Sequence, residues 1–182
     1  MRKPSDVRAA GAVLYFLPVQ TRLPLKFGAE TTTSVTCARA MVTVTDGQGR
    51  TAKGWGETPL SVHWVWPSRL PYEKRHVALK EFCVCLAEAW SQFESSGHPI
   101  EIGFDFQEEI LPLLLARFNQ QHPDWGEPMP WLAALVCCSL FDLATHDAYG
   151  QLHQLPSYAT YNAQFMNRDL GDFLTPAGDL SL

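Results

Sequence analysis

The segment VTCARAMVTVTDGQGRTAKGWGETP, residues 35–59, has the sequence pattern of a β-hairpin. Its first eleven residues place Val, Thr, Cys and Met at alternating positions, which is typical of a half-buried strand. The turn residues Asp46-Gly47-Gln48-Gly49 follow, and they can take the positive φ angles that a hairpin loop requires. Residues 50–57 then return, so the segment predicts two antiparallel strands.

On the N-terminal side, residues 12–20 form an apolar, β-rich run that predicts a first strand. The polar and proline-containing residues 21–24 end it. Residues 22–34 are expected to form a long loop, because they are too many for a tight turn, and loops of this length are usually functional or mobile. The N-terminal part therefore predicts a three-stranded antiparallel meander.

On the C-terminal side, the apolar period changes to that of helices. A first helix is predicted from Pro71 to near Gly97. Asp105 and Glu108 have the spacing of a capping box and predict the start of a second helix. Pro112 lies inside that helix, so the helix should kink or restart there.

A third helix is predicted to open at Pro130 and to end with Gly150 as the residue after its C-cap. The whole pattern, strands first and helices afterwards, predicts an α+β fold. We expect a three-stranded antiparallel meander followed by a three-helix bundle packed on one face of the sheet.

Composition excludes several classes of protein. The chain has 182 residues, a net charge of −5, 46% apolar residues and 12% aromatic residues, as expected for one acidic globular domain. Its apolar runs are shorter than the roughly 20 residues that span a bilayer, and its N-terminus lacks a signal-peptide core, so we expect a cytoplasmic protein without membrane contact. The sequence contains no cluster of Lys and Arg residues of the kind that would indicate nucleic-acid binding. The five cysteines lack any C-x-x-C spacing and should be buried thiols. A (β/α)₈ barrel needs about 250 residues and cannot fit.

Four motifs together resemble the N-terminal region of the mandelate racemase and muconate lactonizing enzyme branch of the enolase superfamily. They are PLKFG at 24–28, GWGETP at 54–59, DLATHDAYGQ at 142–151 and the Leu-Pro step at 155–156. The sequence departs from the family pattern at three positions, where His146 replaces a common Trp, Gln151 a common Lys and Gln154 a common Gly.

This resemblance implies a capping domain over residues 1–161 and, over residues 162–182, a linker where the family's barrel domain would begin. Family members use magnesium to abstract a proton α to a carboxylate, as racemases, epimerases, cycloisomerases or acid-sugar dehydratases. Because the catalytic groups lie on the barrel, the chain alone is expected to be catalytically incomplete and to hold no catalytic or metal-binding residue. Its implied partners are a barrel domain in cis or in trans, which would carry Mg²⁺, a carboxylate-bearing substrate and further copies of the chain.

The resemblance also implies two capping segments, residues 22–34 and 58–70. Their candidate substrate-contacting residues are Arg22, Lys26, Phe27, Glu30, Trp64 and Trp66. The cations could meet a polar or anionic group of the substrate, and the aromatic rings could exclude water. In the alternative interpretation, Phe27 and the tryptophans pack within the domain or against its partner.

Two further alternatives remain open in the sequence. Asp142, His146 and Asp147 with His153 are residue types that bind metals, but their helical spacing favours a helix-surface or domain-interface role. The whole chain could also be a free-standing binding or interaction module that has the capping fold without the chemistry.

Overall fold

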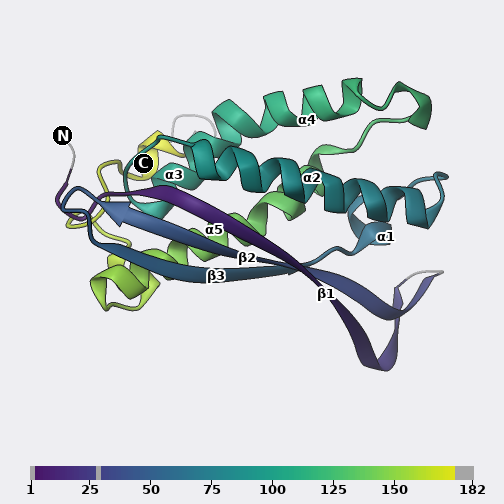
Figure 1. Cartoon of the computed structure of the whole chain (residues 1–182), viewed down its shortest axis with the longest axis horizontal. Helices are drawn as coiled ribbons and strands as arrows, with labels where there is room; N and C mark the ends of the chain where they lie inside the picture. Colours follow the sequence, from purple (N-terminus) through teal and green to yellow (C-terminus); the bar gives the residue numbers. More distant parts are fainter. Residues whose placement is uncertain (1–2, 28–29, 175–182) are drawn as a thin grey trace, which may run out of the picture.

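Three antiparallel strands in the order β1-β2-β3 form the sheet of the computed structural model, which describes residues 3–27 and 30–174. The strands are β1 (Val7–Phe27), β2 (Glu30–Asp46) and β3 (Thr51–Pro59). The helices are α1 (Val62–Val65), α2 (Tyr72–Gln92), α3 (Pro99–Asp105), the π-helical turn η1 (Phe106–Ile110), α4 (Leu111–Gln120), α5 (Trp131–His153) and the 3₁₀ turns η2 (Pro123–Trp125), η3 (Ser157–Thr160) and η4 (Leu170–Asp172). The predicted α+β order is confirmed (Figure 1).

The predicted loop between β2 and β3 is held by Asp46. Its carboxylate accepts hydrogen bonds from the backbone N–H groups of Gln48 and Arg50, both at 2.9 Å, and pairs with the Arg50 side chain at 2.7 Å. Gly49 has φ of 78°, the positive value that glycine adopts without strain. The turn therefore fixes the register of β2 against β3.

The core lies between the sheet and helices α2 and α5. On β2, the alternate residues Ala38, Ala40, Val42 and Val44 are fully buried, as the period-2 pattern predicts. Helix α5 is long and apolar enough to cross a membrane by length and composition alone, but half of its apolar window is buried in the fold. It packs on β3 and β2, as the central helix of a folded domain does.

Gly54 and Gly56 are strand glycines and not turn or bulge glycines, although glycines spaced in this way often mark hairpins and bulges. Both lie in the middle of β3 and face α5. A Cβ on Gly54 would lie 2.0 Å from the backbone N of Ala148, and one on Gly56 would lie 2.0 Å from the carbonyl oxygen of Leu140. The two glycines allow the backbone of the helix to approach that of the strand.

The helix ends also differ from the predictions. Helix α2 ends at Gln92, short of Gly97. The capping box is formed by His98 and Glu101 at the start of α3, not by Asp105 and Glu108. The His98 side chain accepts from the backbone N–H of Ile100, and Pro99 occupies the first turn, where no N–H partner is needed.

The predicted interruption at Pro112 is confirmed, since a new α-helix starts at Leu111 after the π-helical turn η1. The prediction for Gly150 was wrong. Helix α5 continues to His153, and Gln154 takes the left-handed conformation with φ of 55°. Gly150 is buried where a Cβ would lie 2.9 Å from the carbonyl oxygen of Leu155, so close packing requires the glycine there.

Candidate functional site

Residues 22–34 are mainly strand, which corrects the predicted loop. The pairs Gln20↔Ser34 and Leu25↔Thr32 leave four residues of β1, 21–24, opposite the single residue Thr33 of β2. The Thr21 hydroxyl donates to the carbonyl oxygens of Thr33 at 3.1 Å and Thr32 at 3.4 Å, and so closes this bulge. Beyond the bulge, residues 25–27 and 30–32 form a paired extension, which we call the arm.

The arm and its bulge present mostly exposed side chains. Leu23 is 72% exposed and Leu25 62% exposed, and the predicted contact residues Arg22 and Lys26 are also exposed. Of the other predicted residues, Phe27 and Glu30 pair with each other at the ends of β1 and β2, and their side chains, like Gly28, lie outside the described part of the chain.

The second predicted segment contains a short helix, α1, that points one tryptophan outward. Val62 and Val65 anchor α1 in the core, while Trp64 on the opposite side is 51% exposed. Trp66 differs, because it is buried against Trp125 and its Nε1–H donates to Glu127 at 3.1 Å. Trp66 thus packs within the domain, and only Trp64 is available to an external molecule.

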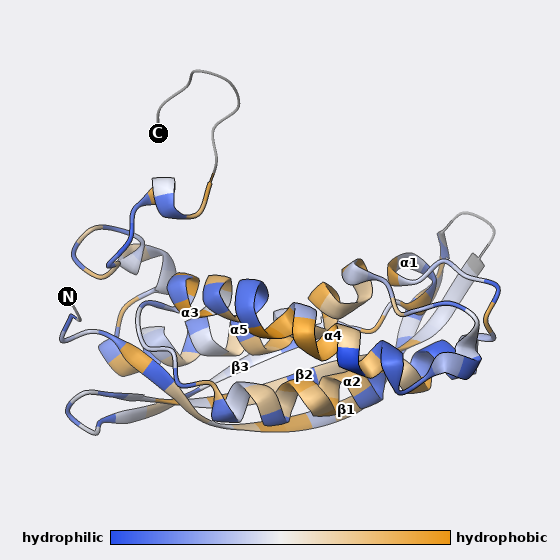
Figure 2. Cartoon of the chain, turned by 90° about the horizontal axis from the view of Figure 1, so that it is seen from above, coloured by the Kyte–Doolittle hydropathy of each residue, from blue (hydrophilic) through white to orange (hydrophobic). Residues whose placement is uncertain are grey.

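Thr36 connects the base of the arm to the segment that carries α1. Its carbonyl oxygen accepts from the backbone N–H of Leu60 at 2.8 Å, and its hydroxyl lies 2.9 Å from Nε2 of His76 on α2. Burial, followed by the charge of Lys80, lowers the pKa of His76, which favours its neutral form. The arm and α1 therefore share one end of the molecule, as Figures 1 and 2 both show.

The structure does not bring the polar residues of α5 together as a metal site. Asp142 and His146 lie 3.8 Å apart, where burial raises the pKa of Asp142 and lowers that of His146. Asp147 instead accepts from the backbone N–H of Trp55 at 2.8 Å, and His153 contacts the carbonyl oxygen of Ser5. Among the described residues, no three His, Cys, Asp or Glu side chains form a group that could hold a metal ion.

The sequence analysis did not predict a buried cluster of hydrogen bonds around the Glu101 carboxylate on α3. The buried carboxylate accepts from the backbone N–H groups of His98 and Arg168 and from both nitrogens of Asn167, at distances between 2.5 and 2.9 Å. Burial alone would raise the pKa of Glu101, but these hydrogen bonds lower it. Glu101 thus fastens residues 167–168 to the domain, and only its place in the His98 capping pattern could have indicated it.

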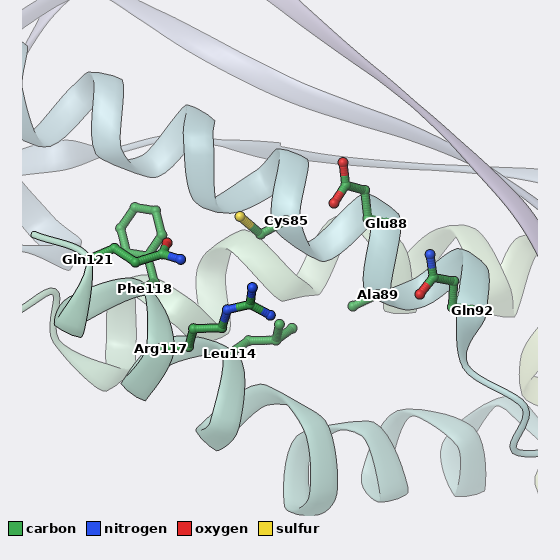
Figure 3. A pocket seen from close by; sticks show the side chains of 8 residues that line it. All are labelled: Cys85, Glu88, Ala89, Gln92, Leu114, Arg117, Phe118 and Gln121. Carbon is green, nitrogen blue, oxygen red and sulfur yellow. The ribbon is translucent and has the colours of Figure 1, made fainter.

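A groove of about 240 Å³ lies between α2 and α4 (Figure 3). Its lining residues from α2 are Cys85, Glu88, Ala89 and Gln92, and those from α4 and its end are Leu114, Arg117, Phe118 and Gln121. Burial, followed by the charge of Glu88, raises the pKa of Cys85, so its thiol is protonated at neutral pH and is a weak nucleophile.

No protein-family model matches the chain, and no curated protein matches it either. Solved structures do match. A mandelate racemase/muconate lactonizing enzyme-like protein from Rubrobacter xylanophilus is 19% identical, with a TM-score of 0.39, and the match covers 84% of this chain and 33% of that one.

Two further solved structures match the chain to a similar extent. An enolase superfamily member from Roseovarius nubinhibens is 16% identical with a TM-score of 0.39, covering 81% of this chain and 31% of that one. An enolase from Bradyrhizobium complexed with magnesium and mandelic acid is 16% identical with a TM-score of 0.42, covering 82% and 33%. The chain thus spans about a third of the length of the solved chains it matches.

Proposed function

We propose that this chain is the substrate-capping domain of a magnesium-dependent enzyme that abstracts a proton α to a carboxylate. The observation that carries the proposal is the placement of the arm and α1 at one end of the domain, joined through Thr36. These are the two segments that the sequence resemblance assigns to substrate capping.

The exposed side chains at this end suit a lid. Leu23, Leu25 and Trp64 are each more than half exposed, and large apolar side chains gathered at one end of a domain are typical of a surface that meets another body. Arg22 and Lys26 add two cations beside them. Such a surface would exclude water from a substrate below it and attract a polar or anionic group at the far end of that substrate.

The chemistry itself would come from a barrel domain, joined in cis or supplied in trans. Asp142, His146, Asp147 and His153 do not converge on a common point, so the described residues of this chain do not fit a magnesium site. In this proposal the barrel supplies the metal and the base. The cap positions the substrate and selects it.

The test starts from the DNA that follows codon 182 and from the neighbouring genes. If they encode a barrel domain, that domain is expressed together with this chain, and Mg²⁺-dependent exchange of α-protons for deuterium is measured on 2-hydroxy, amino and sugar acids. We expect exchange only with both parts present. Lys26→Ala and Trp64→Ala should raise KM or change the preferred acid, because they remove contacts to the substrate.

Leu113→Ala is the matched control, since Leu113 is 69% exposed but lies on α4, away from the arm. It should leave both KM and substrate preference unchanged. Deuterium exchange by the purified chain alone, abolished by EDTA, would contradict the proposal. So would arm variants that behave like the control. Absence of any barrel-encoding DNA would favour the free-standing binding module.

A further inference from the structure

Arg75, in the first turn of α2, is a buried cation whose charge is not paired. Its side chain belongs to a residue that is only 4% exposed. Its Nη1 donates a hydrogen bond to the carbonyl oxygen of Trp66, the residue that ends α1. Among the side chains that the structure describes, no Asp or Glu forms an ion pair with Arg75. A single neutral carbonyl therefore faces a full positive charge.

Other arginines of the chain show how unusual this arrangement is. Arg39, Arg50 and Arg168 have more exposed side chains, at 44%, 52% and 32%, and each of them pairs with a carboxylate. An arginine guanidinium stays charged inside proteins, and a buried charge costs free energy that a counter-ion can offset. Arg75 is thus the arginine that needs an anion most, and the described part of the chain does not supply one.

The unpaired nitrogens of Arg75 lie on one edge of its guanidinium group. Nη1 is occupied by the Trp66 carbonyl, which leaves the parallel N–H groups of Nε and Nη2. Nε is completely buried and has no hydrogen-bond partner among the described residues. Nη2 also makes no hydrogen bond to them, but it is not enclosed, so this end of the edge reaches the surface. Two parallel donors match the two oxygens of a carboxylate, as in the strongest arginine ion pairs.

We infer that the Nε–Nη2 edge of Arg75 is a binding site for a carboxylate. Since the edge is open at one end only, a flat carboxylate fits it better than a tetrahedral phosphate, whose remaining oxygens would be left without donors. The irregular segment 67–71 between α1 and α2 can shift to admit the group without breaking a helix or a strand pair. This site is separate from the exposed residues of the arm, and the inference does not rest on the proposed capping function.

Titration of the purified chain with sodium acetate tests the site, with sodium chloride at equal ionic strength as the reference. The Nε–H resonance of Arg75 in proton–nitrogen correlation spectra should shift downfield until it saturates, because the buried N–H gains an acceptor. Sodium phosphate should bind more weakly. The carboxylate can belong to a small molecule or to an acidic side chain of another protein. A glutamate blocked at both ends of its backbone distinguishes these sources, since tighter binding than acetate indicates a protein side chain and weaker binding a small molecule.

Arg75→Lys is the variant that isolates the edge, because lysine keeps the charge and a donor for the Trp66 carbonyl but lacks the two parallel N–H groups. Its affinity for acetate, measured from the rise in Tm with acetate concentration, should fall about tenfold or more. Arg69→Lys is the matched control, since Arg69 is an exposed cation in the connecting segment, and it should bind acetate like the unmodified chain. Circular dichroism checks that both variants fold.

The resonance of Arg75 is measured in the unmodified chain, so that part of the test does not depend on the folding of a variant. An Nε–H resonance that acetate leaves in place, or that chloride moves equally, would overturn the inference. So would an Arg75→Lys variant that binds acetate as tightly as the Arg69→Lys control. Tighter binding of phosphate than of acetate would overturn the assignment to a carboxylate.

Discussion

Substituting Gly56 by Ala tests directly how the sheet and its central helix are held together. A Cβ at this position would lie 2.0 Å from the carbonyl oxygen of Leu140 and 2.6 Å from the backbone N of Ala144. Ordinary contacts of a Cβ begin at 3.4 Å. Because both atoms belong to the backbone of α5, no side-chain rotation can relieve the overlap, and the helix must move away from β3.

The cost follows from what α5 buries. Leu140, Phe141 and Ala144 are fully buried on this helix, so its displacement loosens contacts along the whole helix–sheet contact. Overpacking of a core typically costs 1–3 kcal/mol, and a clash between backbones lies at the upper end. We expect the free energy of unfolding to fall by about 3 kcal/mol, which corresponds to a decrease of about 6–12 °C in Tm for a domain of this size.

Urea and thermal unfolding of the purified variant measure the effect. Gly11→Ala is the matched control, because no atom lies within 4 Å of the added Cβ and Gly11 is also in a strand. That control should change stability by no more than about 1 kcal/mol. Adding Ala144→Gly to Gly56→Ala should not restore stability, since the clash involves backbone atoms. Rescue by that second substitution, or a Gly56→Ala variant as stable as the control, would refute the reasoning.

Three further predictions concern polar contacts. Burial lowers the pKa of His98 to about 4 in the folded chain, so on acidification the unfolded chain takes up a proton first. The free energy of unfolding should therefore fall by up to about 3 kcal/mol as the pH falls from about 6.5 to 4. Urea unfolding of His98→Asn, in which the Asn side chain still caps the helix, should show a smaller dependence on pH. Glu101→Gln should cost about 3 kcal/mol in unfolding experiments and speed amide exchange at Asn167 and Arg168. Asp147→Ala should cost about 1 kcal/mol in the same unfolding assay and speed exchange of the Trp55 amide.

The periodicity of apolar residues in the sequence predicted those strands and helices that bury one face in the core. The alternation in residues 35–45 and the helical period after residue 71 both reflect contact with the same core. The arm escaped prediction because it projects beyond that core, so its side chains need not alternate between apolar and polar. Pro24 also suggested the end of a strand, whereas it lies in the bulge, where its missing N–H is not needed for pairing.

Other features depend on contacts between residues distant in sequence. Gly54 and Gly56 look like turn glycines until α5 is placed against them, about 90 residues later in the chain. Asp147 satisfies the N–H of Trp55 on the open edge of β3, and nothing local to either residue indicates that contact. Trp64 and Trp66 are two residues apart in one predicted segment, yet α1 exposes the first and its end turns the second into the core.

The bulge in β1 changes which face of the sheet the alternate residues of this strand occupy. Between the register shift at Ala9/Gly11 and the bulge, odd-numbered residues such as Val13 and Tyr15 lie on the face of the sheet away from the helices, and even-numbered ones face the helices. The four residues inserted opposite Thr33 reverse this order, so Leu25 pairs with Thr32 and shares the side that carries Ala38 and Ala40 further along β2. An apolar residue of the arm is thereby moved from the outer face of the sheet to the side on which the helices lie.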